Sequence, residues 1–410
     1  MVNGNSFRKY INFSLFNLVV VALYGVLMRY KIGFEFPFLD QKFLQHAHSH
    51  FAFSGWITQT LMVLMIYVLN GVCKNISLKK YKIILNANLV CAYGMLVSFT
   101  FTGYEPISII FSTLSLFVSF LFAYIFIKDS TASNVQLSGK NWFTAAILFN
   151  ILSAAGTLVL GYMMATKNLN QNLYLSSVYY YLHFQYNGWF FFACMGLLVH
   201  AFSAAIPTYR ENKSVFKLFA GACIPAYFLS VLFLNPPMWL YTILVFSALA
   251  QAIGWFKFLQ TANNHRKEIM QKTSLVMKYL ILFVVTAVTI KLTLQLFSTI
   301  PAISKLAFGF RTIVIAYLHL VLLAIFSTFL ITYIYGSGLI SKSKLTVSAI
   351  LIFTIGIFLN ELLLLIQGVA SFSYTLIPFS NELLFGISVV LLLGSLILFM
   401  SNLNKIIKNF

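Results

Sequence analysis

Residues 45–59 read QHAHSHFAFSGWITQ and place three histidines at the start of an apolar segment: His46, His48 and His50. Part of this stretch recurs along the chain. HFAFSGW, which begins at His50, has a near-copy in HFQYNGW from His183, and a weaker match, HLVLLAIFS, begins at His319. The spacing is 133 residues for the first pair and 136 for the second. Similar segments at nearly equal spacing predict three repeats whose corresponding helices face a shared centre.

The composition is that of a membrane protein. Of the 410 residues, 60% are apolar and only 9% are charged, whereas about 25% of a soluble domain is charged. We therefore expect an all-α, polytopic membrane protein that forms a single domain over residues 1–410. Twelve apolar runs approach the length of about 20 residues that a hydrocarbon core requires: 10–28, 45–70, 81–103, 106–127, 141–165, 178–206, 215–235, 238–261, 273–297, 311–336, 345–367 and 377–401.

Two proline-bearing segments divide long apolar runs into helical hairpins. Glu105-Pro106 separates the third run from the fourth, and Asn235-Pro236-Pro237 separates the seventh from the eighth. Proline has no N–H to donate within a helix, and its ring clashes with the preceding turn. We therefore expect helices 3 and 4, and likewise helices 7 and 8, to form tight pairs.

The basic residues predict the orientation of the chain and its surroundings. Lysine and arginine number 27 against 8 acidic residues, but they are scattered over short connections. This pattern favours anionic lipid headgroups as partners, with no role for nucleic acid. Twenty basic residues lie at the termini or in connections after even-numbered runs, and six lie in the remaining connections. The positive-inside rule then predicts cytoplasmic N- and C-termini, and we expect a bacterial plasma membrane as the location.

The histidines of the second run divide between two faces of the predicted helix. His46 and His50 are one helical turn apart and share a face, whereas His48 lies about 200° away from each. At most two of the three can therefore address one site. An interfacial, structural role explains His46 or His48 taken singly. The recurrence of His50 at His183 and His319 favours a shared function instead, because imidazole is a common ligand of iron, copper and zinc.

The chain resembles subunit I of the heme-copper oxidases, including their C-type and nitric-oxide-reductase branches. The shared features are twelve helices, cytoplasmic N- and C-termini, and a histidine near the outer end of helices 2, 6 and 10. The resemblance covers the whole chain in topology and three short stretches in motif. It implies an axial ligand of a low-spin heme on helix 2, at His50 or alternatively at His46 or His48. It implies a copper ligand on helix 6, at His183.

The helix 10 motif carries both a match and a departure. Residues 316–319, AYLH, resemble the family's AHxH motif with Tyr317 in place of its first histidine. The resemblance places His319 at the low-spin heme position, and it places Tyr317 where the ligand of the high-spin heme would be. A tyrosine phenolate ligates iron in some heme proteins, so Tyr317 is the substitution of greatest chemical consequence.

Further departures fall where the family holds its dinuclear centre. Residues 215–235 contain no histidine, although the family places a histidine pair on helix 7, and Phe184-Gln185 replaces the residues that follow its copper ligand. The resemblance therefore implies at most one heme, of the low-spin type, and copper is not expected. It implies electron transfer in a respiratory chain, or sensing, with membrane or cytochrome subunits as partners. We do not expect the chain alone to reduce dioxygen or nitric oxide.

Two ionisable residues lie at membrane depth, Lys291 in predicted helix 9 and Glu361 in predicted helix 11. An isolated charge is costly there. We therefore expect them to face protein or water, and either to pair, directly or through Asn360, or to line a path for protons or solute. A twelve-helix secondary transporter is thus an alternative, and a cofactor-free structural or assembly component is a third. Threefold repetition of four-helix units favours the oxidase-like arrangement, whereas twofold repetition of six-helix units would favour a transporter.

Overall fold

The computed structural model describes residues 4–73, 76–132, 136–168 and 170–407, and this part of the chain is helical, without β-strands. Within it, twelve helical segments are long and apolar enough to cross a membrane. The prediction of an all-α, polytopic membrane protein is confirmed. The observed spans begin and end within seven residues of the predicted ones, because hydropathy and proline breaks determine where each span starts and stops.

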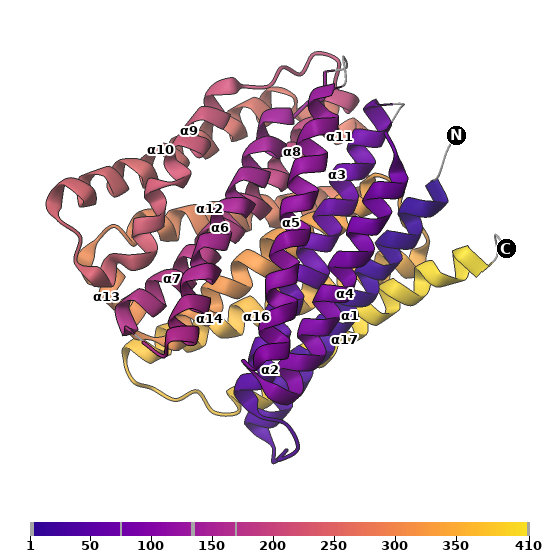
Figure 1. Ribbon diagram of the computed structural model, residues 1–410. Helices are drawn as coiled ribbons and strands as arrows, with labels where there is room; N and C mark the ends of the chain where they lie inside the picture. The colour runs from indigo at the N-terminus through magenta and orange to yellow at the C-terminus, as the bar shows by residue number, and fades with distance from the viewer. Residues whose placement is uncertain (1–3, 74–75, 133–135, 169, 408–410) are drawn as a thin grey trace. The chain divides into compact units, whose positions relative to one another are not determined.

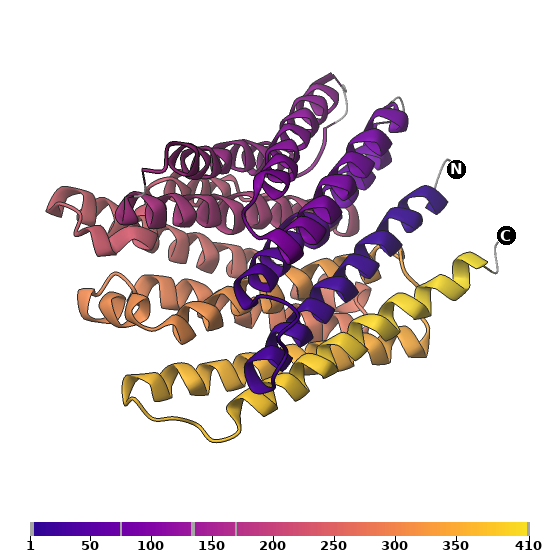
Figure 2. The same cartoon turned by 60° about the horizontal axis from the view of Figure 1, so that its bottom comes forward.

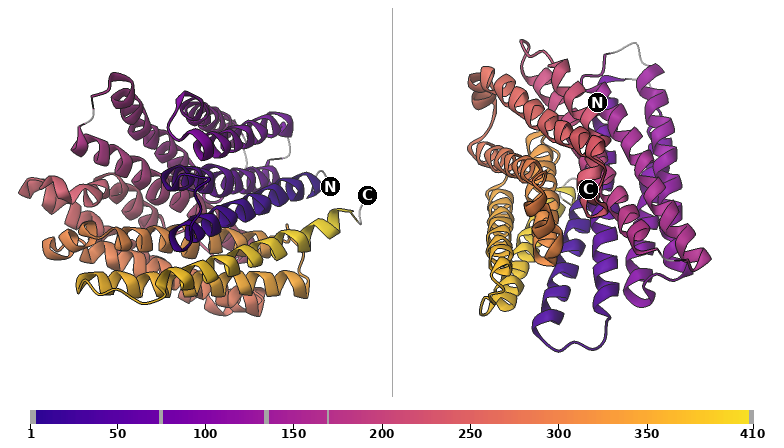
Figure 3. Two further views of the ribbon diagram at one scale, coloured as in Figure 1. Left: turned by 90° about the horizontal axis from the view of Figure 1, so that it is seen from below. Right: turned by 90° about the vertical axis from the view of Figure 1, so that its left-hand side faces the viewer.

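The chain divides into two compact units, and the first comprises residues 1–70, 74–122 and 326–410. In this unit α1 packs against α17, and α16 pairs with α17 in a hairpin that can be followed in Figures 2 and 3. α2 packs against α4. The elements, in which η marks a π- or 3-10-helical segment, are α1 (Gly4–Gly33), α2 (Gln41–Phe51), η1 (Ala52–Thr58), α3 (Gln59–Val72), α4 (Leu78–Thr102), α15 (Thr328–Gly336), α16 (Lys344–Phe372) and α17 (Ser380–Ile407).

The second unit comprises residues 71–73 and 123–325. In it α6 packs against α7, and α9 packs against α10 (Figure 1). Three elements run from one unit into the other: the last two residues of α3 belong to the second unit, and α5 (Pro106–Ala132) and η4 (Leu320–Ser327) are each divided between the two. The remaining elements are α6 (Lys140–Thr166), α7 (Gln171–His183), η2 (Phe184–Phe190), α8 (Phe191–Ala205), α9 (Lys213–Cys223), η3 (Pro225–Leu234), α10 (Met238–Asn264), α11 (Arg266–Lys272), α12 (Leu275–Phe297), α13 (Pro301–Gly309) and α14 (Arg311–His319).

The predicted breaks lie at helix ends, as expected. α5 begins at Pro106, and η3 stops at Leu234 just before the second proline segment. The predicted seventh helix is not one continuous α-helix, however. α9 ends at Cys223 and a 3-10 segment begins at Pro225, because a proline inside a helix removes one hydrogen bond and clashes with the turn before it.

α6 and α7 come into close contact at Gly156. A Cβ atom added to this glycine would lie 2.6 Å from the carbonyl oxygen of Ser177 and 2.9 Å from the backbone nitrogen of Tyr181. Small residues allow membrane helices to approach backbone to backbone, where van der Waals packing holds them together. Gly156 therefore sets the separation of this helix pair.

Candidate functional site

In each of the three repeats, the histidine is followed almost at once by a π-helical turn. η1 begins two residues after His50, and η2 and η4 begin directly after His183 and His319. Hydrogen bonds in a π turn join residues five apart instead of four, and such turns are rare and frequently found at functional sites. The repeats predicted from sequence thus share an unusual local structure, which supports their common origin.

Polar side chains from neighbouring helices bond the carbonyl groups of η1. Asn17 Nδ2 of α1 donates to the oxygen of Gly55 at 2.5 Å, and Asn88 Nδ2 of α4 donates to the oxygen of Ser54 at 3.1 Å. Tyr93 donates its hydroxyl proton to Asn17 Oδ1 at 2.7 Å. Irregular backbone inside a membrane is tolerated only where protein or water satisfies its polar groups, and these asparagines fill that role.

The second repeat bonds the corresponding carbonyl in a similar way. Cys223 Sγ of α9 donates to the oxygen of Asn187, which occupies the position of Ser54 in the repeat, at 3.7 Å. In both repeats the donor belongs to the next membrane span along the chain. The donor follows its acceptor by 34 residues in the first repeat and by 36 in the second. The two repeats therefore share a packing contact as well as a turn.

We expect Asn17→Leu to destabilise the protein by about 1–3 kcal/mol, because the carbonyl of Gly55 then loses its donor in an apolar interior. The melting temperature of the detergent-purified protein, followed by tryptophan fluorescence, measures the effect. Asn381→Leu, at an exposed position of α17, is the matched control and should melt with the wild type. If both variants melt together, the turn does not need the Asn17 donor.

The histidines of α2 divide between two faces, as predicted. His50 Nε2 lies 3.0 Å from the hydroxyl oxygen of Tyr104, and the ring of His46 stands edge-on to the same tyrosine with centroids 4.6 Å apart. His48 points to α1 instead, with Nδ1 3.1 Å from the carbonyl oxygen of Val21. His46 and His50 thus share one environment, and His48 occupies another.

His183 is held on both sides of its ring. Its Nε2 lies 2.8 Å from the carbonyl oxygen of Cys223, and its Nδ1 lies 3.1 Å from the side-chain nitrogen of Asn187. The side chain is 1% exposed. In this arrangement Nε2–H donates to Cys223 and Nδ1 accepts from Asn187, so a metal would have to displace one of these partners. The contacts favour a structural role, and the copper-ligand role implied by resemblance stays a prediction.

His319 and Tyr317 lie in different surroundings. His319 Nδ1 is 2.8 Å from the carbonyl oxygen of Ile315, one turn earlier in α14. Tyr317 packs edge-on against Tyr186 of η2, with ring centroids 6.3 Å apart. Tyr317 therefore contacts the π turn of the second repeat, a contact that no sequence motif indicated.

Lys291 belongs to a chain of buried polar side chains in the second unit. Its Nζ donates to Gln295 Oε1 at 2.7 Å, and Gln295 Nε2 donates to Gln251 Oε1 of α10 at 2.9 Å. All three side chains are buried, Lys291 being 8% exposed. The structure thus brings both glutamines into one chain with the lysine. Lys291 therefore faces protein, as predicted, and its acceptor is an amide oxygen.

Glu361 lies in the first unit, in α16, and its side chain is half-buried. Its Oε1 accepts a hydrogen bond from Asn360 Nδ2 at 3.1 Å. Asn360 is the residue through which the sequence predicts a link to Lys291. Because Lys291 belongs to the other unit, that link stays a prediction.

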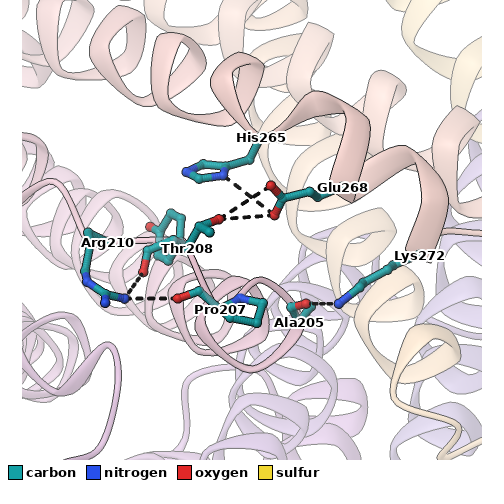
Figure 4. A network of polar contacts seen from close by, with 8 residues as sticks. Ala205, Pro207, Thr208, Arg210, His265, Glu268 and Lys272 are labelled. Carbon is teal, nitrogen blue, oxygen red and sulfur yellow. Dashed lines mark hydrogen bonds and ion pairs between the residues drawn. The ribbon is translucent and has the colours of Figure 1, made fainter.

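Sequence reasoning gave no role to a polar cluster that joins the connection after α8 to α11 and to His265, the residue before α11 (Figure 4). Thr208 Oγ1 donates to Glu268 Oε2 at 3.3 Å, and His265 Nδ1 lies 3.9 Å from the same oxygen. Burial raises the pKa of nearby Tyr209 to about 12, and the negative charge of Glu211 adds to this effect. No periodicity marks these residues, so only the fold reveals their contacts. They anchor a loop.

No protein-family model matches this chain, and no curated protein is significantly similar to it. Within the described residues, no group of three or more His, Cys, Asp and Glu side chains is arranged to hold a metal ion. The resemblance to the heme-copper oxidases therefore rests on topology and on the histidine-bearing stretches.

Proposed function

We propose that this chain is an integral membrane heme protein of the heme-copper oxidase type. It retains a single low-spin heme and serves in electron transfer or sensing. The observation that carries the proposal is the recurrence of a histidine followed by a π turn in three helices. Helical packing alone does not require an imidazole before each turn. Imidazoles on corresponding helices are the donor set from which the oxidase type builds its cofactor sites.

Two histidines each have the hydrogen bond that is common in residues that would hold a heme. His48 and His319 each direct Nδ1 to a backbone carbonyl oxygen. Metal-ligating histidines commonly donate their second ring N–H in this way, which fixes the tautomer with its lone pair on Nε2. His50, which the repeat favours, directs Nε2 to Tyr104 instead. We therefore favour His48 among the helix 2 candidates. Its pairing with His319 follows from the resemblance alone, and a heme held by these residues would supply a one-electron redox couple.

A dinuclear centre fits these residues poorly. It needs a second metal held by about three imidazoles and a further ligand for a high-spin heme. Both ring nitrogens of His183 are engaged, Tyr317 occupies the position of the high-spin ligand, and residues 213–234 contain no histidine. The proposal is accordingly restricted to one heme without reduction of dioxygen or nitric oxide.

The proposed setting is a bacterial plasma membrane with both termini in the cytoplasm. It rests on the distribution of lysine and arginine among the connections between spans. A cytochrome or another membrane subunit is the proposed electron partner. Anionic lipid headgroups would contact the basic connections on the cytoplasmic side.

An optical spectrum of the purified protein, reduced minus oxidised, tests the proposal together with heme and metal analysis. We expect one low-spin heme per chain, lost in His48→Ala and in His319→Ala and retained in the loop control His265→Ala. Retention of heme by His48→Ala with loss in His50→Ala would overturn the helix 2 assignment. Absence of heme from protein made in heme-replete cells, or two hemes with stoichiometric copper and gas turnover, would overturn the function.

The buried chain of Lys291, Gln295 and Gln251 favours a second candidate function, proton-coupled transport. Three linked polar side chains at membrane depth are typical of ion and proton paths. Proteoliposomes containing a pH-sensitive dye test this candidate through proton flux under an imposed gradient. The transport reading expects flux in the wild type that Lys291→Met abolishes, and equal flux in both proteins would exclude it.

A further inference from the structure

His46 and His50 form a ligand pair that the heme proposal leaves unused. They lie one turn apart in the second half of α2 and face the same tyrosine. Two histidines at positions i and i+4 on one helix face are the arrangement by which helices bind zinc in metalloproteases. The pair therefore has the spacing that a single metal ion requires.

The repeat shows that this pair is not needed for the fold. The positions that correspond to His46, four residues before each repeat histidine, are occupied by Tyr179 in the second repeat and by Ile315 in the third. Both of those segments form the same helix and π turn. A second imidazole on this face is thus particular to the first repeat and needs an explanation of its own.

Tyr104 brings a third donor atom to the pair. Its hydroxyl oxygen lies 3.0 Å from His50 Nε2. Two ligand atoms bound at about 2.0–2.1 Å to one tetrahedral zinc ion lie about 3.3 Å apart. The observed separation is therefore close to that of two atoms sharing one ion, and the ring of His46 borders the same hydroxyl-bearing residue.

The surrounding contacts orient these groups before any ion arrives. The ring of His50 stacks on Phe99, with centroids 4.4 Å apart and planes inclined by 17°, and Phe99 is fully buried. Tyr104 follows Gly103, whose φ of 64° ends α4 in a conformation that favours glycine. Tyr104 is 43% exposed, so an ion in solution can reach the site.

We propose that His46 and His50, assisted by Tyr104, bind a divalent transition-metal ion of the zinc and copper class where the second half of α2 packs against the end of α4. Water completes the coordination shell. Imidazole nitrogens suit both metals, and the shell, which lacks a third strong ligand, makes the ion exchangeable. The proposal does not rest on the heme, because the heme is assigned to the opposite face of α2.

The test uses the full chain, purified without a histidine tag and stripped of metal, and titrated with Zn²⁺ alone in a calorimeter. We expect one equivalent to bind. His46→Ala and His50→Ala should each weaken binding at least tenfold, and Tyr104→Phe should weaken it less. His265→Ala removes a partly buried histidine of the other unit and should leave the affinity unchanged. Should His50→Ala fold poorly, His46→Ala carries the test, because its side chain is half-exposed.

Electron paramagnetic resonance of bound Cu²⁺ supplies a second readout. We expect nitrogen splitting from two imidazoles in the wild type and from one in each histidine variant. Equal Zn²⁺ affinity in the wild type and His46→Ala would overturn the site, as would Cu²⁺ without nitrogen ligands. Loss of the heme spectrum in step with Zn²⁺ binding would also overturn it, because the pair would then belong to the heme.

Discussion

Gly156→Ala is expected to destabilise the protein by about 1–3 kcal/mol, the usual penalty for adding a methyl group where none fits. The new Cβ would lie 2.6 Å from the carbonyl oxygen of Ser177 and 2.9 Å from the backbone nitrogen of Tyr181. Both neighbours are backbone atoms of α7, so no side-chain rotation can relieve the contact. The two helices would have to separate, and the packing on either side of the contact would loosen.

Gly161→Ala provides a matched control in the same helix. A Cβ atom at Gly161 has no neighbour within 4 Å, and alanine is the better helix former by about 1 kcal/mol. This variant should therefore melt at or above the wild-type temperature, whereas Gly156→Ala melts below it. Equal melting temperatures for the two variants would show that α6 and α7 do not touch at Gly156.

The second large effect is expected at Gln295, which links Lys291 to Gln251. Gln295→Leu removes the amide oxygen that accepts from Lys291 Nζ at 2.7 Å. Breaking a buried polar pair by removing one member costs about 3–5 kcal/mol in soluble proteins, because the remaining group stays buried without its partner. Lys291 bonds a neutral amide of its own helix, and the bond that Gln295 donates to α10 is of a kind that is weaker on average inside membranes, so we expect about 2–4 kcal/mol.

A double variant separates this contact from packing. Lys291→Met/Gln295→Leu replaces both partners with apolar side chains, and it should recover most of the stability that Gln295→Leu alone loses. Gln260→Leu, at an exposed position of α10, is the control and should be nearly neutral. Without recovery in the double variant, the loss at Gln295 would have to come from packing instead of from the stranded lysine.

The sequence predicts the fold well because the hydropathy of the chain alone identifies its membrane spans. Twenty apolar residues bounded by charge or proline can do little else than cross the bilayer as a helix. The misses have local causes. Pro225 was not recognised as a break because apolar residues flank it on both sides, and the short helices α11 and α13 fall in connections that hydropathy treats as loops.

The site was predictable only in part. Helical periodicity correctly separated His46 and His50 from His48, since residues four apart share a face. The partners of these residues come from distant positions, for example Tyr104 beside His50 and Val21 beside His48. Such contacts depend on how helices pack, which no local pattern encodes. The π turns were missed for the same reason, because an apolar run reads alike whether its hydrogen bonds span four residues or five.

The three π turns also carry information about ancestry. A π turn holds one residue more than the α-helical turn that it replaces, since its hydrogen bonds reach one residue further. The π segment that contains this extra residue begins directly after the histidine in copies as different as HFQYNGW and HLVLLAIFS. We infer that a single insertion, made in an ancestral unit before it was duplicated, is older than the sequence differences that now separate the copies. Deleting one residue from the π turn of a copy would then convert it back into an α-helical turn.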